Sequence, residues 1–177
     1  MGLCSGLGGG IIRDVLLGHG PPAALTNPAY IPTALAGACV AFVVQIEHRT
    51  WDRAFIGVDA VALSMWATAG ALKALGDGLG WLPAVLLGTI TAIGGAITRD
   101  LLLQRVPAVF AQGTLYATVA ILVAAVAVIF ARTHGLSSGT GTTVAIVVGV
   151  TLRLVAYWRG WQLPRGLDWK LGQRADT

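Results

Sequence analysis

The sequence predicts an all-α, polytopic membrane protein, and three observations lead to this fold class. Of the 177 residues, 55% are hydrophobic and only 11% are charged, whereas soluble domains usually carry about 25% charged residues. Apolar segments long enough to cross about 30 Å of hydrocarbon recur along most of the chain. Unpaired backbone groups are costly in lipid, so these segments are expected to be helices. The third observation is an internal repeat.

Six apolar segments are expected to cross the membrane. They are separated by polar or turn-forming stretches such as EHRTWDR, GDGLG and RTHGLSSGTG. In chain order the segments are Met1 to Leu17, which is short for a spanning helix, Ala29 to Ile46, Ala54 to Leu75, Trp81 to Leu103, Thr114 to Ala131 and Gly141 to Trp158.

The repeat is a glycine-rich motif that occurs twice. GLGGGIIRDVLL begins at Gly6 and AIGGAITRDLLL begins at Ala92. The offset of 86 residues that separates Gly8 from Gly94 aligns a shared G-G-x-I-x-R-D core, which indicates a duplication. Three spans separate the two copies, so they cross the membrane in opposite directions. They form an inverted repeat, an architecture common in transport proteins.

The repeat divides the chain into three parts. Residues 1–53 are the first copy, residues 54–133 are the second, inverted copy, and residues 134–177 are a final transmembrane helix with a basic tail. The second copy has a helix before its glycine motif, DAVALSMWATAGALKAL, whose counterpart would precede Met1. We therefore expect the first copy to lack its first helix. A complete chain would have two three-helix units and a seventh helix.

The distribution of basic residues predicts the orientation. One end of the spans collects nine of them, namely Arg49, Arg53, Arg99, Arg105, Arg153, Arg159, Arg165, Lys170 and Arg174, and the other end has Arg13, Lys73 and Arg132. Lys and Arg are enriched on the cytoplasmic side of membranes, so the C-terminus is expected there. The net charge of +4 belongs to this asymmetry, and no nucleic-acid partner is expected.

The glycines allow two interpretations. Small residues at four-residue intervals let helices approach closely, and both copies carry such a ladder: Gly2, Gly6 and Gly10, matched by Gly88, Ala92 and Ala96. Glycines in series exceed what packing needs, and each weakens a helix by roughly 1 kcal/mol relative to Ala. The alternative is a kinked or opened turn near mid-membrane that exposes carbonyls to a water-lined path. The series are Gly8, Gly9 and Gly10, and Gly94 and Gly95.

Each glycine series is followed by an adjacent charged pair, Arg13-Asp14 and Arg99-Asp100. Adjacent residues on a helix point about 100° apart, so the members of one pair need not bond each other. One interpretation is that they snorkel to the membrane interface. The other is that they line a pore vestibule or form ion pairs between the repeats.

The helix before the second motif also carries two charges. Asp59 and Lys73 lie fourteen residues apart, close to four helical turns, and so share about the same face roughly 21 Å apart. Intramembrane charges usually face protein or water, although both residues lie near helix ends and snorkelling is the alternative. Thr89, Thr91 and Thr98 add hydroxyls to the glycine helix, or simply bond to their own helix.

Several other functions are excluded. The glycine run does not match the dinucleotide fingerprint, because its last position is Ile11, and the chain has no Walker loop. Cys4 and Cys39 lie in apolar runs without neighbouring metal ligands, which favours small buried hydrophobes. No nucleophile and base occur at a recognisable spacing. We therefore expect no enzyme activity, no metal and no cofactor.

The doubled G-G-x-x-x-R-D motif, the inverted repeat and the seventh helix resemble the bacterial branch of the trimeric intracellular cation (TRIC) channel family. The resemblance extends from Gly2 to Trp158. It implies a homotrimer in which each protomer has its own pore for monovalent cations, mainly potassium. The family's pore lies around the kinked second and fifth helices, which correspond here to Gly8, Gly9, Gly10, Gly94 and Gly95. Arg13, Asp14, Arg99 and Asp100 match the motif's charged residues, and Asp59 and Lys73 match polar positions of the fourth helix.

The leading hypothesis is therefore a homotrimeric cation channel without a cofactor in the bacterial inner membrane, with membrane lipid and itself as partners. A secondary transporter of a small solute is the alternative, because inverted repeats and broken helices also serve alternating access. A third possibility is a non-conducting scaffold built on small-residue packing. Replacing Gly9 and Gly95 by Ala would then alter assembly but no flux.

Overall fold

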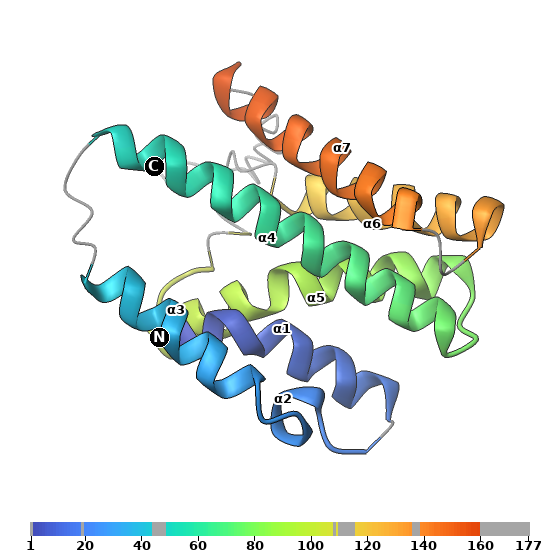
Figure 1. Ribbon diagram of the computed structural model, residues 1–177, viewed down its shortest axis with the longest axis horizontal. Coiled ribbons are helices and arrows are strands. Elements are labelled where there is room, and N and C mark those ends of the chain that lie inside the picture. The colour runs from blue at the N-terminus through green and yellow to red at the C-terminus, as the bar shows by residue number, and fades with distance from the viewer. Residues whose placement is uncertain are drawn as a thin grey trace, which may run out of the picture.

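The computed structural model is all-helical over the residues that it describes, which are 2–18, 20–43, 49–107, 109, 116–135 and 139–159 (Figure 1). The helices are α1 (Gly2–Leu17), α2 (Ala23–Thr26), α3 (Tyr30–Val43), α4 (Arg49–Gly76), α5 (Trp81–Leu102), α6 (Tyr116–His134) and α7 (Gly139–Trp158). This arrangement confirms the all-α fold class. The single turn of α2, which follows Pro22, is not predicted by the apolar pattern.

Within the part of the chain that the structure describes, four helices are long and apolar enough to cross a membrane: Ile56–Gly76 within α4, and α5, α6 and α7. The 16 residues of α1 extend about 24 Å, less than the hydrocarbon thickness. α4 begins at Arg49, ahead of the expected start at Ala54, because hydropathy marks only the apolar part of a helix that continues through polar residues.

Residues with positive φ follow four of the described helices, among them α6, which is followed by Gly135 with φ 89°. After α4, Gly78 has φ 80°, and the amide of Leu79 donates to the carbonyl of Ala74, a Schellman end that favours glycine. After α1 and α5, the left-handed residues are Gly18 and Gln104, with φ 69° and 55°. These two positions are related by the repeat offset, so both glycine helices stop at the same place in the repeat.

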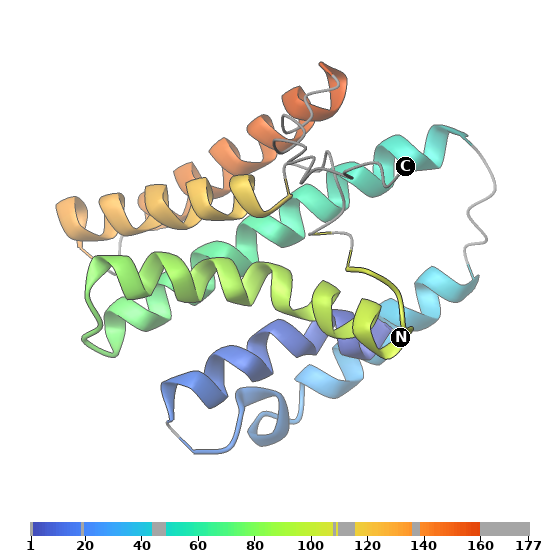
Figure 2. The same cartoon turned by 180° about the vertical axis from the view of Figure 1, so that it is seen from behind.

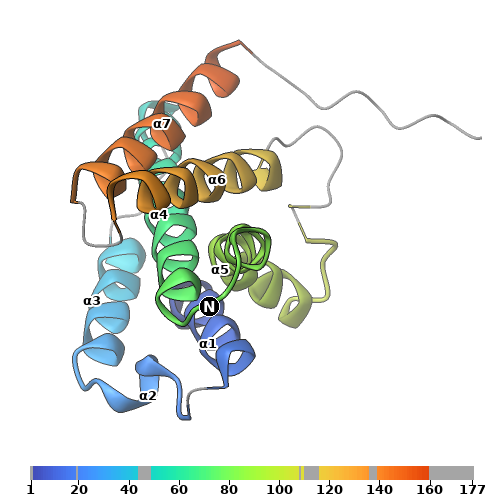
Figure 3. The same cartoon turned by 90° about the vertical axis from the view of Figure 1, so that its right-hand side faces the viewer.

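α4 and α5 lie at the centre of the helix bundle. Figure 3 shows α6 and α7 on one side of them and α1, α2 and α3 on the other. The core among α4, α5, α6 and α7 is built mainly from alanine with a few larger residues such as Leu63 and Val123, while many leucines, isoleucines and valines point outward. Small residues inside and large apolar residues outside are typical of helices packed in lipid.

α1 and α5 run in opposite directions and pack backbone against backbone (Figure 2). A Cβ atom on Gly9 would overlap the carbonyl oxygen of Thr91, and one on Gly95 would overlap that of Ser5. The offset of 86 residues converts the first of these contacts into the second. Such a reciprocal contact is what a two-fold relation between the repeats produces, and it agrees with the expected inversion.

The glycine ladder is a close-packing face at Gly88 in the second copy, where a Cβ would overlap the carbonyl oxygen of Ala67, but not at Gly6 or Gly10 in the first copy. A Cβ on Gly6 would meet nothing within 4 Å, and one on Gly10 would make only ordinary contacts with Trp66 and Arg13 at 3.8 and 4.0 Å. In α1, the residues that need to be small are Gly9, one position before Gly10, and Gly8, two positions before it. The tolerance at Gly10 explains why its counterpart is Ala96.

The two repeats differ in what covers them. Between α1, α3 and α4 lies an apolar groove of about 360 Å³, lined among others by Leu7, Tyr30, Ala34 and Trp66. The repeat counterparts of the first three are Ile93, Tyr116 and Ala120, which belong to or pack against the core that α4 completes. In a protein with full two-fold symmetry, a helix equivalent to α4 would fill this groove.

The glycine contact predicts unequal effects of one substitution at neighbouring positions. Gly9→Ala forces α1 and α5 apart, and overpacking of this kind costs about 1–3 kcal/mol. Gly10→Ala and Gly6→Ala find space for the Cβ and gain helix propensity of up to about 1 kcal/mol. Thermal unfolding of the purified protein in detergent should therefore give a lower Tm for Gly9→Ala and an equal or higher Tm for both controls. Equal Tm values for all three variants would contradict the backbone contact.

Candidate functional site

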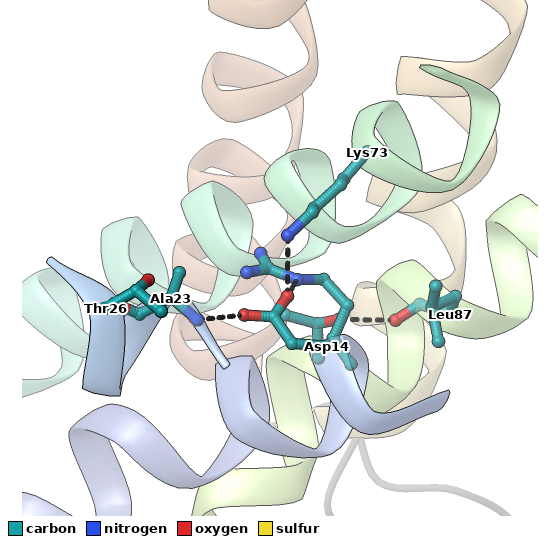
Figure 4. A network of polar contacts seen from close by, with 7 residues as sticks. Asp14, Ala23, Thr26, Lys73 and Leu87 are labelled. Carbon is teal, nitrogen blue, oxygen red and sulfur yellow. Dashed lines mark hydrogen bonds and ion pairs between the residues drawn. The ribbon is translucent and has the colours of Figure 1, made fainter. Parts of the chain in front are cut away.

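Asp14 is the centre of a polar network at the C-terminal end of α1 (Figure 4). Its Oδ1 accepts hydrogen bonds from Arg13 Nε and Lys73 Nζ, both at 2.8 Å. Its Oδ2 accepts one from the backbone amide of Ala23, also at 2.8 Å. Lys73 belongs to α4, so Asp14 joins the first repeat to the second and also fixes α2. The residues Arg13 and Asp14 are only 6% and 5% exposed.

The second charged pair lies at the opposite end of the bundle, near the end of α5. Arg99 Nε donates to Asp100 Oδ1 at 2.8 Å, and Asp100 is buried while Arg99 remains partly exposed. In both repeats, therefore, the arginine does bond the adjacent aspartate. The 100° spacing leaves this bond optional, and it forms because the long arginine side chain turns back toward its neighbour.

The structure bears differently on the two interpretations, ion pairing and snorkelling, at the two charged pairs. The burial of Arg13 and its place in a network with Lys73 agree with an ion-pair role between the repeats, and not with snorkelling. The side chain of Arg99 is 36% exposed, so interface anchoring remains compatible with its position. The first network has two cationic groups and one carboxylate, and so carries an excess positive charge.

A third polar cluster links α4, α6 and α7. The Tyr116 hydroxyl donates to Asp59 Oδ1 at 3.1 Å, and a guanidinium nitrogen of Arg153 lies 3.6 Å from Asp59 Oδ2. The Arg153 guanidinium also stacks over the Tyr116 ring, 4.6 Å from its centroid, a favourable cation–π geometry. The sequence analysis did not identify this pairing. A basic residue inside the last apolar span was the available signal, because an intramembrane charge requires a partner.

Two charged residues of α4, Asp59 and Lys73, therefore serve different neighbours. Lys73, near its C-terminal end, reaches α1, whereas Asp59, in its N-terminal half, reaches α6 and α7. Their shared helix face does not bring them to a common site. Instead, Asp59 connects the N-terminal half of α4 to α6 and α7, and Lys73 connects its C-terminal end to α1.

The threonine hydroxyls of α5 bond to their own helix, which is the simpler of the two interpretations. Thr89, Thr91 and Thr98 donate to the carbonyls of Val85, Leu87 and Gly94 at 2.8, 2.6 and 2.8 Å. Each bond stays within the helix, four residues back.

Both glycine series lie inside continuous helices, between the polar clusters at the two ends. Gly8, Gly9, Gly94 and Gly95 are buried against one another. α5 nevertheless changes direction along its length, since Figure 3 shows its first part end-on and its later part crossing the view. A role for these glycines in a pore remains a prediction.

The arrangement as a whole is a closed contact between two oppositely oriented repeats, with charged side chains at either end. A small polar solute can pass along this contact only if α1 and α5 shift relative to one another, because the glycine backbones already touch. The described residues hold no group of three or more His, Cys, Asp or Glu side chains suited to a metal ion.

A family model described as "Glycine transporter" matches residues 1–45 and 56–132, which is more than half of the chain. A membrane protein of Deinococcus radiodurans is 40% identical over 121 residues, covering 68% of this chain and 56% of that protein. The chain thus spans little more than half the length of this relative.

Two further relatives are matched over more of their length. The inner membrane protein YadS of Escherichia coli is 31% identical over 157 residues, covering 88% of this chain and 75% of YadS. The membrane protein YvgT of Bacillus subtilis is 30% identical over 165 residues, covering 93% and 79% of the two chains. These relatives agree with the membrane fold described above.

Solved structures give the same result. A TRIC cation channel studied for its conductance has a TM-score of 0.81 and 30% identity, over 92% of this chain and 79% of the other. The TRIC orthologue from Rhodobacter sphaeroides has a TM-score of 0.78 and 31% identity, over 88% and 79%. Together with the doubled motif and the family model, these matches identify the chain as an integral membrane protein that belongs to the bacterial branch of the TRIC channel family.

Proposed function

We propose that the chain forms a homotrimeric channel for monovalent cations, mainly potassium, with one pore in each protomer and no cofactor. The observation that carries the proposal is the reciprocal glycine contact between α1 and α5. It occurs in a fold that closely matches channels of known structure. The bacterial inner membrane is the proposed location, with the C-terminus in the cytoplasm as the basic residues indicate.

The proposed ion path follows the contact between the repeats. It runs from Arg13, Asp14 and Lys73 at one end of the bundle to Arg99 and Asp100 at the other. Gly8, Gly9, Gly10, Gly94 and Gly95 are the proposed points at which α1 and α5 bend or separate, and Thr91 and Thr98 are the proposed polar positions beside them. Backbone carbonyls freed at such a bend can replace part of an ion's hydration shell.

Lys73 is the proposed moving part of this path, whereas Asp14 is the fixed part. The side chain of Lys73 is 39% exposed, compared with 7% for that of Asp14. With its ammonium on Asp14, the network has an excess positive charge that repels a cation. When Lys73 leaves, Arg13 and Asp14 neutralise each other and this barrier falls. The paired charges therefore act as a gate rather than as a selectivity filter.

The two sides of the Lys73–Asp14 pair are predicted to differ in stability and in current. Asp14→Asn leaves the buried Arg13 without its counter-charge and should cost about 3 kcal/mol or more. Lys73→Gln removes a half-exposed partner and should cost about 1 kcal/mol or less, while raising the open probability. Thermal unfolding and single-channel recording measure the two effects. Similar stability losses, together with an unchanged open probability, would refute the division into fixed and moving parts.

Potassium conduction itself is tested by recording from the purified protein in planar bilayers, with potassium on one side and a large organic cation on the other. Unitary currents carried by potassium, with reversal potentials that exclude the organic cation, are the expected result. Arg132→Gln, a change at an exposed position, is the matched control and should conduct as the unmodified chain does. Electrical silence from verified trimers would reject the channel.

A second candidate function is secondary transport of glycine. It is favoured by the description of the family model that matches most of the chain, and inverted repeats serve alternating access as well as conduction. Proteoliposomes preloaded with glycine would then accumulate labelled glycine by counterflow in the absence of ionic current. Currents without counterflow would leave the channel as the function.

A further inference from the structure

A small pocket opens beside the Asp14 network, where the end of α1, the turn of α2 and the last turn of α4 meet. Its volume is about 180 Å³, and Asp14, Lys73, Thr26, Leu17 and Pro21 are among its lining residues. Figure 4 shows Lys73 approaching Asp14 from α4, with Ala23 and Thr26 on the α2 side. The pocket therefore presents a cationic and an anionic side chain next to each other.

The cationic side of the pocket has unused binding capacity. An ammonium group has three N–H donors, and among the described residues Lys73 donates one hydrogen bond, to Asp14. The side chain is 39% exposed, so its remaining donors are accessible. Because Arg13 already balances Asp14, the positive charge of Lys73 is in excess at this end of α1. This favours a ligand with a carboxylate.

The anionic side accepts a cationic group. Asp14 Oδ2 receives one hydrogen bond, from the Ala23 amide, and a carboxylate oxygen has two lone pairs. Asp14 Oδ1 and Lys73 Nζ lie 2.8 Å apart, so the ligand's ammonium and carboxylate must be close together as well. The ammonium and carboxylate of an α-amino acid are separated by a single carbon atom and meet this requirement.

The size and walls of the pocket restrict the ligand further. Its volume corresponds to the share of roughly six water molecules in the liquid, which suits a solute of about five non-hydrogen atoms. Leu17 and Pro21 offer no polar partner for a ligand side chain. A free phosphate is disfavoured because its charge would face the Asp14 carboxylate, and a bare monovalent cation is disfavoured by the excess positive charge.

We propose that this pocket binds a small zwitterionic amino acid, whose carboxylate bonds to Lys73 and whose ammonium bonds to Asp14. The choice of glycine as the first ligand rests on the second candidate function given above. The site itself rests on the charges and dimensions of the pocket. Occupation of the site would add a second bridge across the contact between Lys73 and Asp14 and so couple ligand binding to the contact between α1 and α4.

Calorimetric titration of the purified protein with glycine tests the site. Saturable binding is expected, whereas acetate alone and ethylamine alone should not bind, and leucine should bind at least tenfold more weakly than glycine. Lys73→Gln should raise the Kd for glycine at least tenfold, and Lys73→Arg should restore part of the affinity. Arg132→Gln removes a positive charge from an exposed position at the same end of the bundle and should leave the Kd within about twofold.

A second measurement needs no variant. The sequence contains one other lysine, Lys170, which serves as an internal reference for amine acylation. Glycine should lower the acylation of Lys73 relative to Lys170, read by mass spectrometry, with the same half-saturation as the calorimetric titration. This ratio corrects for reagent that glycine itself consumes, and it tests the site even if Lys73→Gln does not fold.

Four results would overturn the proposal: no saturable glycine binding, acetate binding as strong as that of glycine, an unchanged Kd in folded Lys73→Gln, or unprotected Lys73. Potassium currents recorded in parallel separate this failure from that of the proposed channel. Currents without glycine binding remove the site and leave the channel. Glycine binding without currents or counterflow leaves the site and removes both transport functions.

Discussion

The structure depends on one contact, the touching backbones of α1 and α5 at their paired glycines. No side chain fits between Gly9 and the Thr91 carbonyl, or between Gly95 and the Ser5 carbonyl. The distance between the two helix axes is thereby fixed, and in lipid such close packing replaces the hydrophobic effect as the force between helices. The charged residues that follow each glycine series are then carried to opposite ends of the bundle. The internal two-fold relation thus places a polar network at each end.

α4 is the element that converts this symmetric contact into an asymmetric protein. It packs on α5, α6 and α7 with a surface of small residues, while its Lys73 reaches α1 and its Asp59 reaches α6 and α7. α3, by contrast, contacts α1 and α2 among the described helices. The second repeat is therefore well packed, and the first repeat depends on α5 and Lys73 for its attachment. The pocket beside Asp14 lies at this weaker junction.

Much of this fold can be predicted from the sequence, because the hydropathy pattern and the constant offset of 86 residues between the two glycine motifs can be read directly from it. Six apolar helices, the inverted repeat and the family follow from them, and among the described residues four of these helices are long and apolar enough to cross a membrane. The packing face of α1 does not, since Gly6 and Gly9 are chemically identical and only the position of Thr91 distinguishes them. The pairing of Asp59 with Tyr116 and Arg153 is equally hidden, because it joins three helices whose rotation about their axes the apolar pattern leaves open. The bond between Arg13 and Asp14 is likewise not predictable from the sequence, because it depends on how the flexible arginine side chain turns.

The separation of the two glycine series along the chain has a consequence for biogenesis. α1 leaves the ribosome first, but its partner surface on α5 follows some 86 residues later, and a helix with three consecutive glycines is intrinsically weak. The second repeat, by contrast, makes its main contacts between helices adjacent in the sequence, which favours early assembly. The amino-terminal part of the chain therefore matures last, reversing the usual order of synthesis. Until α5 is inserted, the glycine surface of α1 lacks the backbone against which it packs in the finished fold.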